Sequence, residues 1–236
     1  MKRIIFPLDV SDLKKAEYFI DTLKNDIDIF KIGLELFYKA GPDWVKNIVK
    51  QKKIKVFLDV KLHDIPNTVL GAVKNLLDIE PIFITVHLDE STQFFEKVYK
   101  QCKYEGFLCV SFLTSLNEKD LHNLYVKESI TVKDYVLKKA EIAAGAGCRG
   151  IVCAATEAKY VKEKFGDELV IVTPGIRLKE NNIKNDDQKR VVTPYNAILN
   201  GSDYLVIGRP IRNAENPSEI SKKINKDIEA ALSERN

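Results

Sequence analysis

The chain has 236 residues, a length that favours one α/β domain over residues 1–236 rather than two domains. Its 37 basic and 34 acidic residues are interspersed and leave a formal charge of +3, which argues against a nucleic-acid-binding or membrane-surface protein. No stretch approaches the roughly 18 apolar residues of a membrane span, so we expect no membrane partner.

Short apolar runs recur along the chain, and each is followed by a segment with helical periodicity. The predicted strands span residues 3–8, 29–32, 55–60, 82–86, 106–112, 150–153, 169–172 and 203–207. The predicted helices span residues 13–23, 42–51, 68–77, 92–102, 131–146, 157–165, 194–200 and 217–232. Eight such alternations predict a single (β/α)8 TIM barrel. A doubly wound open sheet is the alternative, because alternation alone does not distinguish the two folds.

Two predicted loops are long, one over residues 114–130 and the other over residues 178–192. The second, LKENNIKNDDQKRVV, is polar and would make a poor core element. It is therefore predicted to be a surface loop able to close over a ligand.

Patterns that often indicate a cofactor or a metal have the wrong context here. The glycines of Gly145–Gly150 match GxGxxG, but they follow a predicted helix and precede a strand, the reverse of a dinucleotide site. The three histidines lack the close spacing of zinc ligands. We predict no cofactor and no metal. The four cysteines form no CxxC and no secretory signal precedes them, so we expect free thiols in the cytoplasm.

Charged residues interrupt or follow the first three predicted strands. Asp9 follows the first, Lys31 lies in the second, and Asp59 and Lys61 come at the end of the third, with Asp64 in the next turn. In a barrel, catalytic groups lie at these carboxyl ends of the strands. Asp59 and Lys61 are two apart, so on a strand they project from the same face.

These charges have two interpretations. An internal ion-pair network closing the top of the barrel would explain them, because a charge inside an apolar strand is costly unless it is paired. However, the signs of Lys31, Asp59, Lys61 and Asp64 alternate, so the set is neutral while each charge is held by its neighbours. We favour a site that holds an ammonium and a carboxylate rigidly beside a substrate.

The last two strands end in residues suited to phosphate. Gly175 and Arg177 follow the seventh strand, and Gly208 and Arg209 follow the eighth. Loops after strands seven and eight are the usual phosphate position in this fold, and arginine offers a charge-assisted fork to phosphate oxygens. The glycines could instead serve turns and the arginines could be surface charges; we favour phosphate binding, with Gln188 folding down from the polar loop.

The motifs resemble those of orotidine 5'-monophosphate decarboxylases. DVKLHDIPNT at residues 59–68 is similar to the signature of that family, and LDV, FKIGLELFYKAGP, Leu113-Thr-Ser, TPGIR and VIGRPI match in the same order over nearly the whole chain. The DxKxxD spacing alone is shared with phosphosugar decarboxylases, whereas HDIPNT combined with TPGIR and the Gly-Arg pair is more specific. The family usually carries small residues after the fourth-strand histidine, whereas here His87 is followed by Leu-Asp-Glu-Ser.

The resemblance implies decarboxylation of orotidine 5'-monophosphate to UMP, the last step of de novo pyrimidine nucleotide biosynthesis, without a cofactor. Lys61 would protonate C6 as carbon dioxide leaves, and Asp59 would lie against the substrate carboxylate. Lys31 and Asp9 would position the ribose hydroxyls and the charged network.

The resemblance also implies a homodimer, in which Asp64 and Thr68 reach across the interface into the partner's site. Thr114 would contact the pyrimidine. The phosphate end would be held by Arg177, Gln188, Gly208 and Arg209. The rival functions are a metal-dependent keto-sugar phosphate decarboxylase on the same scaffold and a non-catalytic phosphate-ligand-binding barrel.

Overall fold

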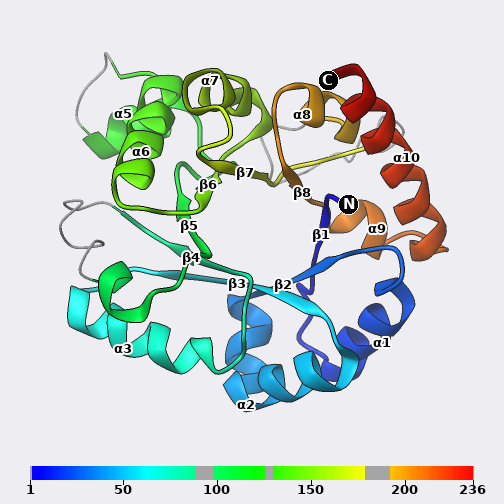
Figure 1. Ribbon diagram of the computed structural model, residues 1–236. Coiled ribbons are helices and arrows are strands. Elements are labelled where there is room, and N and C mark those ends of the chain that lie inside the picture. Colours follow the sequence, from blue (N-terminus) through cyan, green and yellow to red (C-terminus); the bar gives the residue numbers. More distant parts are fainter. Residues whose placement is uncertain (1, 89–97, 126–129, 179–191, 236) are drawn as a thin grey trace.

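The computed structural model describes residues 2–88, 98–125, 130–178 and 192–235. Eight parallel strands form a closed barrel in the order β1 to β8, and helices surround it as an outer ring (Figure 1). The first strand pairs with the last, with Ile4 opposite Leu205 and Ile5 opposite Val206. The predicted TIM barrel is therefore confirmed and the open-sheet alternative is wrong.

The strands are short and lie within or close to the predicted runs. They are β1 (Ile4–Pro7), β2 (Ile29–Gly33), β3 (Lys55–Leu62), β4 (Phe83–Val86), β5 (Phe107–Val110), β6 (Gly150–Val152), β7 (Val170–Thr173) and β8 (Tyr204–Val206). The helices are α1 (Leu13–Leu23), α2 (Leu34–Lys52), α3 (Pro66–Leu77), α5 (Glu118–Tyr125), α6 (Val132–Gly145), α7 (Ala155–Phe165), α8 (Pro194–Leu199), α9 (Arg209–Arg212) and α10 (Pro217–Arg235).

Three helical segments differ from the sequence predictions. Helix α2 begins eight residues before Pro42, directly after β2, and is kinked at Gly41, whose φ of 74° only glycine adopts easily. The predicted loop 114–130 contains α5, and the four-residue α9 follows β8 where only a loop end was expected. Of the predicted helix 92–102, residues 98–102 are helical and the rest lies outside the described residues.

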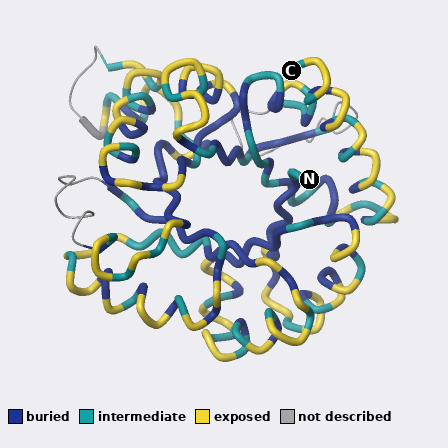
Figure 2. Tube along the Cα trace, in the orientation of Figure 1, coloured by how far each residue is buried: buried dark blue, intermediate teal, exposed yellow. Residues whose placement is uncertain are grey.

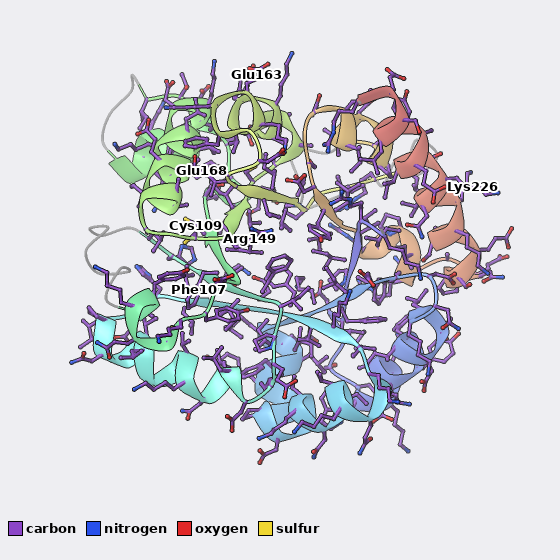
Figure 3. The ribbon with its side chains drawn as sticks, viewed as in Figure 1. Phe107, Cys109, Arg149, Glu163, Glu168 and Lys226 are labelled. Carbon is purple, nitrogen blue, oxygen red and sulfur yellow. The ribbon has the colours of Figure 1, made fainter. Side chains whose placement is uncertain are left out.

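Side chains alternate between the barrel interior and the helix layer, as the two-residue period of a strand requires. The interior cluster consists of Ile5, Ile29, Phe57, Phe83, Leu108 and Val172. Phe107 and Cys109, on either side of Leu108 in β5, belong instead to the layer between strands and helices (Figure 3). The strands form a largely buried ring, and most of the exposed residues lie on the outer helices and the loops (Figure 2). Glu163 and Lys226, for example, lie at the periphery on α7 and α10 (Figure 3).

The interior alternation fixes where the charged residues lie. Lys31 follows Ile29 by two positions on β2, and Asp59 follows Phe57 by two positions on β3, so both continue the inward face toward the carboxyl ends of the strands. The barrel core therefore changes from apolar to charged at its mouth. Among the described helices, none combines the length and apolar character needed to cross a bilayer.

Candidate active site

A cavity of about 540 Å³ lies at the carboxyl ends of the strands, within the size range of small-ligand sites. Its floor is apolar and is formed by inward residues of four strands, Phe57, Val110, Val152 and Val206. One wall carries the charged residues that lie on or follow β1 to β3, and the neighbouring wall carries glycines and arginines that follow β7 and β8. Thr114, on the loop after β5, is buried and also lines the cavity.

Lys31 lies at the centre of the charged wall. Its ammonium nitrogen is 3.2 Å from Oδ1 of Asp9 and 3.3 Å from Oδ2 of Asp59. Its side chain is only 11% exposed, so the two carboxylates supply the counter-charge that water would otherwise provide. A Cβ at Gly33 would come 3.0 Å from this nitrogen and 3.4 Å from Oδ1 of Asp9, so the glycine leaves room for the pair.

Lys61 is brought to Asp59 by an irregularity in β3. Leu58 pairs with Ile84 and Leu62 pairs with Val86, so a four-residue step on β3 stands opposite a two-residue step on β4. Such bulges are common beside active sites, where they re-aim side chains. Lys61 itself has a φ of 48°, in the left-handed region that non-glycine residues rarely adopt. Its ammonium nitrogen lies 2.7 Å from Oδ1 of Asp59.

Thr85 completes the charged wall from β4. It is 1% exposed, its hydroxyl accepts the backbone N–H of Lys61 at 2.9 Å, and it donates to Oδ1 of Asp59 at 3.1 Å. Asp59 is thus surrounded by three hydrogen-bond donors, from Lys31, Lys61 and Thr85.

The environment keeps Lys31 and Asp59 charged. Burial alone would raise the pKa of Asp59, but the ammonium groups of Lys31 and Lys61 outweigh burial and hold that pKa below its ordinary value. Burial alone would lower the pKa of Lys31, but the charges of Asp59 and Asp9 outweigh it and raise that pKa. A carboxylate and an ammonium are therefore fixed at the cavity wall across the neutral pH range.

The neighbouring wall holds the arginines of the site. Arg209 begins the short helix α9, and Arg177 is buried after β7, where its guanidinium donates to the carbonyl of Ile176. A Cβ at Gly208 would lie 2.9 Å from Cγ of Pro7, so glycine allows the chain after β8 to pass close to β1. Gly175 has a φ of 78°, which also favours glycine.

Most of the predicted site residues lie around this one cavity. Asp9, Lys31, Asp59, Lys61, Thr114, Arg177, Gly208 and Arg209 line it. Asp64 and Thr68 do not; both are exposed, one before α3 and the other in its first turn. Gln188 lies outside the described residues. The polar loop is anchored at its end by a bridge between Ile176 and Val192.

Three polar residues of the site were not predicted from the sequence. Glu35 and Arg212 line the cavity, and Thr85 supports its charged wall. Arg212 donates to the backbone carbonyl of Asp9 at 2.7 Å and so ties α9 to the segment after β1. Arg212 could have been predicted from the sequence, because it is the last residue of the GRPIR run that begins at Gly208. The sequence gives no comparable signal for Thr85, because threonine is common in strands.

The charged residues form an ion-pair network, which was one of the two interpretations of their pattern in the sequence. This network also borders a cavity, which is what the other interpretation, a site beside a substrate, requires. The fold places the protein among (β/α)8 barrels with a ligand-sized cavity at the carboxyl ends of the strands, lined here by an ion-pair cluster from β1 to β3 and by arginines that follow β7 and β8.

Comparison with known proteins identifies the family. Residues 2–224 match the model of the Orotidine 5'-phosphate decarboxylase / HUMPS family, and the chain belongs to that family. It is 40% identical over 239 residues to orotidine 5'-phosphate decarboxylase of Carboxydothermus hydrogenoformans, covering 98% of each chain. It is 38% identical to the enzyme of that name from Psychromonas ingrahamii, covering 96% of this chain and 97% of the relative. The crystal structure of orotidine 5'-phosphate decarboxylase from Lactobacillus acidophilus superposes with a TM-score of 0.82 at 31% identity, covering 97% of this chain and 99% of that one.

Proposed function

We propose that this protein decarboxylates orotidine 5'-monophosphate to UMP without a cofactor, the last step of de novo pyrimidine nucleotide synthesis. The observation that carries the proposal is the pair formed by Asp59 and Lys61, 2.7 Å apart on the wall of a cavity whose other wall holds Arg177 and Arg209. An anionic substrate with a phosphate at one end and a carboxylate at the other suits this separation of charges. The family and the names of the relatives support the same substrate.

The reaction breaks the bond between C6 of the pyrimidine and its carboxylate, and the electron pair stays on C6 as carbon dioxide leaves. Lys61 donates a proton from its ammonium group to that carbon, which gives UMP and leaves a neutral amine. Asp59 lies against the substrate carboxylate, and Lys31 with Asp9 holds the ribose hydroxyls.

Electrostatic repulsion of the substrate carboxylate can supply only part of the rate acceleration. Two like charges about 4 Å apart repel by roughly 4 kcal/mol at an effective dielectric near 20. Repulsion between Asp59 and the substrate carboxylate therefore accounts for at most about three powers of ten in rate. That is not enough alone, so the ammonium of Lys61 must also stabilise the developing carbanion, which it attracts more strongly than it attracts the ground state.

Binding energy at the phosphate end holds the carboxylate against Asp59. Arg209, at the start of α9, and Arg177, after β7, are the proposed phosphate ligands, with the backbone at Gly208 approaching closely. Gln188 would reach the phosphate from the polar loop. Thr114 contacts the pyrimidine from the loop after β5.

We also propose a homodimer in which Asp64 and Thr68 complete the partner's site. Both residues are exposed near the cavity mouth but do not line the cavity of their own chain. Between them, Ile65 is 63% exposed in the single chain, and a second copy placed here would bury it. A second copy of this chain covering this edge accounts for both observations.

We propose that residues 1–236 act as one catalytic domain in a reducing compartment such as the cytoplasm. All four cysteines are free and three of them are buried. Thiol titration of the denatured protein, taken directly from cells under non-reducing conditions, should count four thiols; fewer would contradict the assigned compartment.

The test of the function is an absorbance assay with orotidine 5'-monophosphate in the presence of EDTA. We expect conversion to UMP at a rate that the chelator does not change. A metal-dependent keto-sugar phosphate decarboxylase would lose its activity in EDTA and would ignore the pyrimidine nucleotide. A non-catalytic barrel would bind the nucleotide and leave its absorbance unchanged.

A further inference from the structure

Thr85 is a buried hydroxyl residue that connects two members of the charged wall. A threonine hydroxyl has one proton to donate and two lone pairs that accept. Here the proton is directed at Oδ1 of Asp59, 3.1 Å away, and a lone pair accepts the backbone N–H of Lys61 at 2.9 Å. One oxygen atom therefore fixes a carboxylate and the backbone of the neighbouring lysine at the same time.

The pairing of β3 with β4 explains why such a link is needed. Between the pairs Leu58–Ile84 and Leu62–Val86, three residues of β3 stand opposite Thr85 alone. Two charged side chains, Asp59 and Lys61, thus enter the barrel where a regular ladder would place one. The N–H of Lys61, whose φ is 48°, is satisfied by the Thr85 side chain in this irregular stretch.

We infer that Thr85 is a positioning residue for the decarboxylation proposed above, because its hydroxyl holds the Asp59 carboxylate and the Lys61 backbone in the arrangement that presents the Lys61 ammonium to the substrate. This inference rests on the proposed function for its effect on turnover. Its geometric part, the link from Thr85 to Asp59, stands on the distances alone.

The kinetic test compares Thr85→Val, which keeps the shape and removes the hydroxyl, with Thr85→Ser, which keeps the hydroxyl. We expect Thr85→Val to lower kcat about 10- to 100-fold, because small displacements of reacting groups have effects of that size. KM should stay within about threefold, and Thr85→Ser should recover most of kcat. If Thr85→Val does not fold, Thr85→Ala removes the hydroxyl without adding bulk and is expected to show the same loss.

Thr173→Val is the matched control. Thr173 is fully buried on β7, its hydroxyl lies 2.7 Å from that of Ser202, and it does not line the cavity. Its replacement should lower stability without a comparable loss of kcat. An unchanged kcat in Thr85→Val, an equal loss in Thr173→Val, or a rise in KM with kcat intact would each overturn the positioning role.

A second readout needs no substrate. The groups facing Asp59 are the ammoniums of Lys31 and Lys61 and the hydroxyl of Thr85. Titration of the Asp59 carboxyl by carbon-13 NMR should give a higher pKa in Thr85→Val than in the wild type, because a donor to the charged form is lost. An identical titration in both proteins would overturn the link. If the wild type did not convert orotidine 5'-monophosphate, the proposed function would fail while this titration still decided the role of Thr85.

Discussion

The ammonium nitrogen of Lys31 lies 3.3 Å from Oδ2 of Asp59, and the two residues enter the barrel from neighbouring strands. Because Lys31 also contacts Asp9, one buried cation joins the ends of β1, β2 and β3. A buried ammonium group is costly unless it is paired with carboxylates. The free energy of unfolding of the barrel should therefore depend on whether the residues of this cluster are ionised.

The first prediction concerns this pair and pH. The pKa of Asp59 is lowered by folding, so its contribution to the free energy of unfolding is present at neutral pH and lost as pH falls through its folded value. Asp59→Asn should destabilise by about 2–3 kcal/mol at pH 7, below the roughly 3–5 kcal/mol for isolating a buried charge, since Lys31 keeps Asp9. Urea unfolding at several pH values should show this difference shrinking toward acid pH.

Asp78→Asn is the control for that measurement. Asp78 pairs with Lys46, but its side chain is 71% exposed, and surface pairs contribute about 0–1 kcal/mol. A difference between Asp59→Asn and wild type that stayed constant from neutral to acid pH would show that the charge of Asp59 does not stabilise the fold.

The second prediction concerns the room left by Gly33. In Gly33→Ala the new methyl group would press on the Lys31 ammonium, 3.0 Å away, and shift it by about a few tenths of an ångström relative to Asp9 and Asp59. We expect kcat to fall about tenfold with little loss of stability. Gly71→Ala on α3 adds a methyl group with nothing within 4 Å and should leave kcat unchanged. Equal activity of both variants would mean that the position of Lys31 is not critical.

The third prediction concerns the phosphate wall. Arg209→Ala removes a guanidinium group that would form two charge-assisted hydrogen bonds to the phosphate, each contributing about 1.5–3 kcal/mol. The kcat/KM for orotidine 5'-monophosphate should therefore fall by about 10²- to 10⁴-fold. Turnover of the phosphate-free nucleoside should barely change. Equal losses on both substrates would contradict the assignment of Arg209 to the phosphate, and Lys159→Ala on the exposed side of α7 serves as the control.

The fourth prediction tests whether Asp64 acts in the partner's site. Lys61→Ala and Asp64→Ala chains should each be inactive alone. Mixed under conditions that allow subunits to exchange, they should recover about a quarter of the wild-type activity, because half the dimers are mixed and each has one native site. No recovery, with exchange verified by mass spectrometry, would place Asp64 in the site of its own chain or outside the site.

The sequence predicted the barrel because strand and helix periodicities alternate clearly, and it predicted the cluster because charges such as Lys31 and Asp59 are rare in buried strands. The carboxyl ends of parallel strands meet at one mouth, so these residues had to be close together. Arg177 and Arg209 could be placed at the same mouth, because they follow the carboxyl ends of the seventh and eighth strands.

The irregular features could not be predicted in this way. The extra residues of β3 opposite Thr85 depend on pairing with β4, which no local pattern records. Helix α5 has only eight residues, EKDLHNLY, which is shorter than the window of about 11 to 18 residues over which a helical period is recognised. Helix α9 has four residues, too few for any periodic signal. The contact of Arg212 with Asp9 joins positions at opposite ends of the chain and required the closed barrel.

The central claim is that the Lys61 ammonium supplies the proton to C6, and Lys61→Ala tests it most directly. We expect kcat to fall by at least about 10⁴-fold, since both proton transfer and carbanion stabilisation are lost, while the affinity for UMP stays within about tenfold. Lys55→Ala, at the exposed start of the same strand, should keep full activity. Turnover by Lys61→Ala within about 100-fold of the wild type would contradict the account, because it would exceed what a lost general acid allows.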